Sequence, residues 1–142
     1  MPESSTKYHP ASRAIITGTS LVLGAGSLAL IFAPAEVASA MRVMDAAAVT
    51  LILQVYGAAL FGLAMTGWMV RHSIVGGIFG RSYVVGNAAH AFVGAFALIR
   101  PATDVSAPWG LRIVTIAYCA LALVFGYLMF AASPQSGLVT GQ

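Results

Sequence analysis

The charged residues of this chain stand far apart, and the stretches between them constrain its fold more than any other feature. Eleven charges, seven basic and four acidic, occur in 142 residues. They leave four long apolar stretches without charge, at 14–34, 46–70, 82–99 and 113–132. A helix rises about 1.5 Å per residue, so about 20 apolar residues cross the hydrocarbon core of a bilayer. These stretches predict four membrane-spanning helices. The charged fraction of 8% argues against an ordinary soluble domain, in which about a quarter of the residues are charged.

The predicted architecture is a single all-α domain, an integral membrane four-helix bundle. Because the connections are short, neighbouring helices are expected to run antiparallel. A membrane β-barrel needs alternating segments of about ten residues, and these are absent. Short polar tails are expected at 1–12 and 133–142. The glycine-rich segment Ser73–Gly80 is either an interfacial loop or an extension of the third helix.

Lysine and arginine predict the orientation of the bundle. Basic residues are retained on the cytoplasmic side of a membrane, whereas acidic residues contribute little to topology. The N-terminal segment and the second loop carry four basic residues, against three on the opposite side: Lys7, Arg13, Arg71 and Arg81 against Arg42, Arg100 and Arg112. Both termini are therefore expected in the cytoplasm. The formal charge of +3 is spread over both sides, which indicates lipid and topology chemistry rather than nucleic-acid binding.

The first apolar stretch allows a second interpretation. A basic segment, the apolar run and the tripeptide Ala38-Ser39-Ala40 together resemble a secretory signal peptide with a small-residue cleavage site. The apolar run is longer than the core of such a peptide, which is about 7 to 15 residues. A retained membrane anchor is therefore the expectation, and a cleaved leader is the alternative.

Few residues point to catalysis or metal binding. All four carboxylates lie outside the predicted spans, which leaves no buried acid–base pair and no set of metal ligands. Cys119 is the single cysteine and is expected to be a buried apolar residue. A proton-driven transporter is disfavoured because such proteins use an intramembrane carboxylate. We expect no catalytic residue, no metal and no cofactor.

Polar side chains inside the apolar stretches form the candidate site. Asn87 and His90 lie three residues apart and therefore on roughly the same face of the third helix. Gln54 and Tyr56 on the second helix and Tyr118 on the fourth are expected to converge with them in a small polar pocket. An ionisable group in a membrane span suggests function, so the candidate ligand-binding residues are Gln54, Asn87, His90 and Tyr118. The alternative is that Asn87 and His90 only bond neighbouring helices to each other.

Small residues recur on one face of several predicted helices. In lipid, helices associate through close van der Waals contact, which small residues permit. Gly24 belongs to such a face on the first helix, Gly62 on the second and Gly126 on the fourth, while Gly86 and Gly94 flank His90 on the third. These five glycines are the candidate packing positions, either within the bundle or against a partner.

One segment carries a family resemblance. The run from Gly80 to Gly94, GRSYVVGNAAHAFVG, is similar to the third helix of small four-helix bacterial inner-membrane proteins of the DoxX-like type. Those proteins often have a glycine–arginine start and a later polar residue or histidine there. The resemblance implies a multi-pass protein of the bacterial inner membrane, sometimes associated with larger membrane complexes. It implies no catalytic residue.

The function expected from the sequence is non-catalytic. The first hypothesis is an accessory or scaffolding subunit, or a self-assembling component, that packs against membrane lipids and other integral membrane subunits or copies of itself. The alternative is a binder or carrier of a small hydrophobic ligand such as a quinone, a pigment or a lipid. An enzyme is the third possibility and the least favoured.

Overall fold

The computed structural model describes residues 10–43, 46–72 and 78–131, and within these ranges the chain is helical with no strand. Its five helices are α1 (Pro10–Phe32), α2 (Pro34–Ala40), α3 (Ala46–Val70), α4 (Ile78–Ala102) and α5 (Trp109–Ala131). Four of them are long and the fifth, α2, is a short helix that follows α1. The predicted all-α bundle of four long helices is confirmed.

The four long helices are also long and apolar enough to cross a membrane, which is the pattern of a multi-pass membrane protein. No more than 33% of the residues in any apolar window are buried by the rest of the chain. Most of the helix surface is therefore apolar and uncovered, as a lipid environment allows.

The structural helices extend beyond some of the predicted spans. The span predicted at 82–99 lies within α4, which begins at Ile78, so residues 78–80 of the ambiguous segment belong to this helix. Residues 73–77 lie outside the described ranges, as do most of the two predicted tails. At the first tail, α1 already begins at Pro10.

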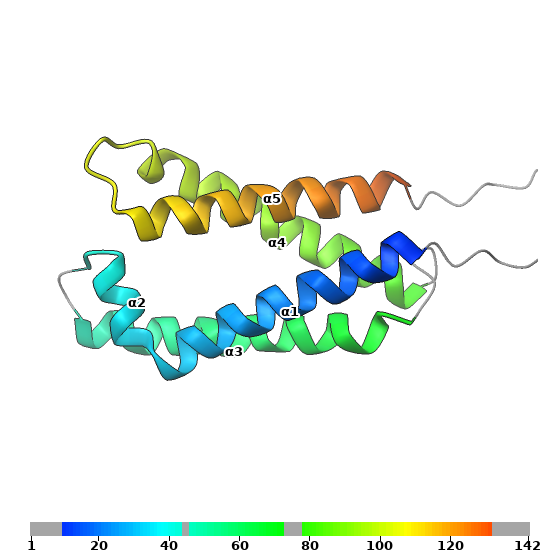
Figure 1. Ribbon diagram of the computed structural model, residues 1–142, viewed down its shortest axis with the longest axis horizontal. Helices are drawn as coiled ribbons and strands as arrows, with labels where there is room; N and C mark the ends of the chain where they lie inside the picture. The colour runs from blue at the N-terminus through cyan, green and yellow to red at the C-terminus, as the bar shows by residue number, and fades with distance from the viewer. Residues whose placement is uncertain (1–9, 44–45, 73–77, 132–142) are drawn as a thin grey trace, which may run out of the picture.

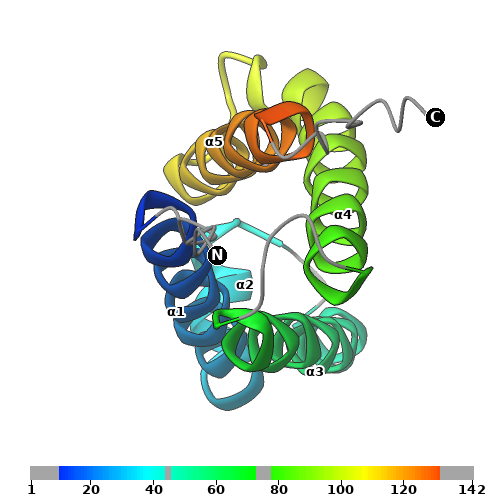
Figure 2. The ribbon, with the colours of Figure 1, turned by 90° about the vertical axis from the view of Figure 1, so that its right-hand side faces the viewer.

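The bundle consists of two closely packed helix pairs. α1 packs along α3, and α4 packs along α5. Seen along the bundle, the four long helices follow one another around a ring in the order α1, α3, α4, α5 (Figure 2). The start of α1, the end of α3, the start of α4 and the end of α5 lie together at one end (Figure 1). α2 and the connection between α4 and α5 lie at the other end, which we call the loop end.

The α1–α3 pair is close because glycines on α3 face α1. A Cβ added at Gly57 would lie 2.9 Å from the Cβ of Leu30 and 3.0 Å from the backbone oxygen of Ser27. A Cβ added at Gly67 would overlap the Ser20 hydroxyl and the hydroxyl of Tyr83. The missing side chain lets the α1 backbone approach α3 directly at Gly57, and at Gly67 it leaves room for side chains of α1 and α4. The helices gain van der Waals contact at both positions.

A hydrophobic core joins the two pairs near the end where α1 begins. It contains Ile16 of α1, Tyr83, Val84 and Ala88 of α4, and Phe125 and Leu128 of α5. The rings of Tyr83 and Phe125 meet edge to face with centroids 5.8 Å apart, which is a favoured aromatic geometry.

α2 is a helix that the sequence interpretation did not anticipate. Pro34 has no backbone N–H and interrupts α1, and it then serves as the first residue of α2. The helix ends in a Schellman motif, in which Val43 N–H donates to Ala38 O and Arg42 N–H donates to Ser39 O. Arg42 occupies the left-handed position, with φ of 54°, that glycine usually takes.

Candidate functional site

Three polar side chains from three helices meet inside the bundle. Tyr56 comes from α3, His90 from α4 and Tyr118 from α5, and each lies near the middle of its helix. His90 Nε2 is 3.1 Å from the Tyr118 hydroxyl and 3.4 Å from the Tyr56 hydroxyl. The two tyrosine hydroxyls also form a hydrogen bond with each other. We call these three residues the polar cluster.

Gly94 makes the position of Tyr118 possible. It lies four residues after His90 on α4, so the two residues share a face of the helix. A Cβ at Gly94 would overlap the Tyr118 ring, so the ring lies directly on the α4 backbone. The Tyr118 ring centroid is 5.5 Å from that of His90. A glycine on α4 therefore brings the α5 hydroxyl within hydrogen-bonding distance of the imidazole.

The polar cluster is only partly enclosed by protein. Tyr118 is 9% exposed, whereas Tyr56 is 36% exposed and His90 is half-buried. Gly86, one turn before His90, is exposed, and an added Cβ there would meet nothing within 4 Å. The helix surface next to the imidazole is therefore open.

One imidazole nitrogen has no partner among the described residues. Both hydrogen bonds of His90 involve Nε2, and none reaches Nδ1. If Nε2 accepts a hydrogen bond from a tyrosine hydroxyl, Nδ1 carries the ring hydrogen and is a donor. In the other tautomer Nε2 carries the hydrogen and Nδ1 is an acceptor. An unpaired polar group in hydrocarbon costs free energy, so Nδ1 is suited to bond a group from outside the chain.

The structure places Gln54 and Asn87 outside the polar cluster. Gln54 is two residues from Tyr56, which corresponds to about 200° around a helix, and its amide donates to Ile31 O on α1 at 3.3 Å. Asn87 is 2% exposed, and its amide nitrogen donates to Tyr83 O of its own helix at 3.0 Å. Of the four predicted ligand-binding residues, only His90 and Tyr118 come together, and Tyr56 completes the set.

The five candidate packing glycines divide into two groups. Three of them contact a neighbouring helix. Gly94 receives the Tyr118 ring, a Cβ added at Gly24 would lie 3.8 Å from Ala64, and a Cβ added at Gly126 would lie 3.4 Å from Phe92. Gly62 and Gly86 would meet nothing within 4 Å. Three glycines whose contacts are closer than those of Gly24 and Gly126 were not among the predicted positions: Gly57, Gly67 and Gly110.

The cluster offers hydrogen bonds rather than charge. Among the described residues, no group of three or more histidine, cysteine, aspartate or glutamate side chains is arranged to hold a metal ion. The two carboxylates in the described ranges, Glu36 and Asp104, belong to α2 and to the α4–α5 connection. The polar cluster is therefore suited to hydrogen-bond a neutral carbonyl, hydroxyl or similar group.

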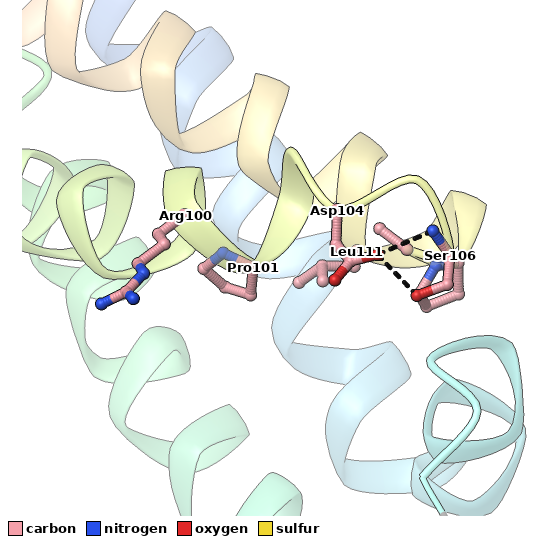
Figure 3. Close-up of a pocket in the computed structure, with 7 residues that line it drawn as sticks. Arg100, Pro101, Asp104, Ser106 and Leu111 are labelled. Atoms are coloured by element: carbon pink, nitrogen blue, oxygen red, sulfur yellow. Dashed lines mark hydrogen bonds between the residues drawn. The ribbon is translucent and has the colours of Figure 1, made fainter.

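A separate open depression of about 450 Å³ lies at the α4–α5 connection. Its lining includes Arg100, Asp104 and Ser106 (Figure 3). Asp104 Oδ1 accepts from the Ser106 hydroxyl at 2.7 Å and from Ser106 N–H at 2.8 Å, and these bonds lower the pKa of the Asp104 carboxyl. The Arg100 side chain points away from Asp104 (Figure 3). The carboxylate therefore closes a turn, and the depression is a feature of the connection.

Comparisons with protein-family models, with curated proteins and with solved structures find no match to this chain.

Proposed function

We propose that this multi-pass membrane protein binds a small, mostly apolar molecule whose polar head reaches the polar cluster of Tyr56, His90 and Tyr118. The observation that carries the proposal is that Nδ1 of His90 has no partner in the part of the chain that the structure describes. It belongs to a half-buried imidazole near the middle of an apolar helix. The open surface at Gly86 gives a ligand access to this ring from the lipid. Of the two functions expected from the sequence, this geometry favours the ligand binder over the scaffold.

The chemistry of the site limits the class of ligand. Because α3, α4 and α5 carry no charged side chain near the cluster, an ionic head would be buried without a counterion, at a large cost in free energy. A neutral head with a carbonyl or hydroxyl group bonds to imidazole and phenol without that cost. Quinones, phenols and sterol-like lipids belong to this class.

The test is native mass spectrometry of the full chain, extracted with its surrounding lipid and then released gently. The wild-type protein is expected to carry a defined small-molecule mass that His90→Ala loses. Gln54→Ala is the matched control, since it removes a polar group from the same bundle away from the cluster. It is expected to retain the bound mass.

Gly86→Leu separates ligand binding from a purely structural role for His90. The leucine Cβ meets nothing within 4 Å and the side chain covers the open surface beside the imidazole, so helix content and thermal stability are not expected to fall. The bound mass is expected to disappear. A wild-type bundle that carries no small molecule, or a Gly86→Leu protein that retains it, would contradict the proposal.

A second candidate is the accessory or scaffolding subunit. The observation in its favour is Gly62, which is exposed on α3 and has open space above it, with Thr66 exposed one turn later. Another membrane subunit, or a second copy of this chain, packs closely on such a surface. In this case Gly62→Leu is expected to dissociate an assembly in blue-native electrophoresis while the monomer stays folded.

The cellular setting also forms part of the proposal. The similarity of residues 80–94 to DoxX-like proteins supports the bacterial inner membrane. The balance of arginine and lysine supports cytoplasmic termini. A reporter fused after residue 142 tests the orientation: alkaline phosphatase is expected to be inactive and a fluorescent protein to be bright.

A further inference from the structure

The end of the bundle opposite the loop end is basic. Arg13 lies in the first turns of α1, Arg71 and His72 directly follow α3, and Arg81 lies in the first turn of α4. These elements come together at one end of the bundle (Figure 1). The two acidic residues in the described ranges, Glu36 and Asp104, lie at the loop end. The basic end therefore has no carboxylate from the described part of the chain to neutralise it.

Two arginines lie close enough to His72, at the corner between α1 and α3, to act on its imidazole. Arg13 and Arg71 both act electrostatically on His72 and lower the pKa of its imidazole, and Arg13 has the larger effect. Like charges repel, so an anion that bonds the guanidinium groups would stabilise this corner.

Trp68 places this corner at the depth of the membrane interface. The Arg71 guanidinium lies 3.8 Å from the centroid of the Trp68 ring and donates to Trp68 O. Tryptophan concentrates at the level of the lipid head groups, where its ring is in the lipid and its N–H reaches water. Stacking on that ring holds the guanidinium at the height where phospholipid phosphates lie.

We propose that the corner formed by Arg13, Trp68, Arg71 and His72 binds the phosphate of an anionic phospholipid. The arginines supply the charge-assisted hydrogen bonds, and Trp68 contacts the upper part of the acyl chains. Phosphatidylglycerol represents this class. Phosphatidylcholine is the control lipid, because its own choline neutralises its phosphate. The site is separate from the polar cluster in the middle of the spans.

The test uses Trp68 as the reporter in the full-length chain. Trp109→Phe leaves Trp68 as the one tryptophan of the two in the sequence. The protein is reconstituted into phosphatidylcholine vesicles containing either brominated phosphatidylglycerol or brominated phosphatidylcholine, and the quenching of Trp68 gives the relative affinity for the two lipids. Using the ratio removes any direct effect of a substitution on the tryptophan itself.

The ratio is expected to favour phosphatidylglycerol in the parent protein. In the double variant Arg13→Gln/Arg71→Gln, the ratio is expected to fall by about fivefold for each of the two arginines removed. Arg42→Gln/Arg100→Gln removes the same charge at the loop end and is expected to keep the parent ratio. If the first double variant fails to fold, Arg13→Gln alone is expected to lose about fivefold, since its side chain is exposed.

Three results would overturn the proposal. The first is equal quenching by both lipids in the parent protein. The second is a ratio that Arg13→Gln/Arg71→Gln leaves unchanged or that the loop-end control lowers equally. The third is loss of the preference when inorganic phosphate replaces chloride at constant ionic strength, which would identify a free anion as the occupant.

Discussion

Gly94→Ala is predicted to destabilise the bundle although it is a single added methyl group. The new Cβ overlaps the Tyr118 ring, which is nearly buried. Overpacking of this kind costs about 1–3 kcal/mol. The displaced ring also loses its 3.1 Å hydrogen bond to His90, worth about 0.6–1.7 kcal/mol between membrane helices. Alanine recovers about 1 kcal/mol through its helix propensity, so the expected net loss is about 1–4 kcal/mol.

Gly86→Ala is the matched control for this prediction. It makes the same substitution on the same helix, where the new methyl group meets nothing within 4 Å. It is expected to leave stability unchanged or to raise it by up to about 1 kcal/mol. Both free energies are measured by equilibrium unfolding in mixed micelles followed by far-ultraviolet circular dichroism. Equal stability of the two variants would refute the argument that Tyr118 lies on the α4 backbone at Gly94.

Three further predictions follow from local geometry. Gly67→Ala is expected to cost about 1–3 kcal/mol because the new Cβ overlaps the hydroxyls of Ser20 and Tyr83. Tyr83→Phe removes a buried hydroxyl that has no regular hydrogen-bond partner among the described residues, and it is expected to restore part of that loss in a double-mutant cycle. His72 is expected to titrate below its ordinary pKa of 6.5 in NMR spectra, and Arg13→Gln is expected to raise that pKa. Because the pKa of His72 is lower in the folded protein than in the unfolded chain, its contribution to stability is complete above pH 6.5 and is lost as the pH falls through the folded pKa. Arg42→Gly is expected to stabilise the bundle by up to about 1 kcal/mol in the same unfolding assay, since glycine adopts a φ of 54° without strain.

The sequence predicted the long helices well because their signal is local. A stretch without charge long enough to cross a bilayer identifies itself, and α3 occupies the predicted range 46–70. α2 was missed because its seven residues are too short to show a helical period. The start of α4 was uncertain because glycine-rich apolar residues suit both an interfacial loop and a membrane helix.

The site was harder to predict, since it depends on how each helix is rotated. Gln54 and Tyr56 are both polar and two residues apart, and the sequence gives no reason to prefer one of them as the residue that faces α4 and α5. The structure turns Tyr56 toward His90 and Gln54 toward α1. The same applies to the glycines: Gly57 and Gly67 pack closely whereas Gly62, between them, does not.

The most direct test of the central claim is a ¹⁵N NMR spectrum of the imidazole of His90 in lipid nanodiscs. Three histidines occur in the chain, and His90→Ala identifies the resonances of this one. The polar cluster predicts that Tyr118→Phe shifts the Nε2 resonance and that Gln54→Ala does not. Ligand binding predicts that removing the copurifying molecule shifts the Nδ1 resonance. An imidazole whose two resonances respond neither to Tyr118→Phe nor to delipidation would contradict both the hydrogen-bonded cluster and the proposed binding function.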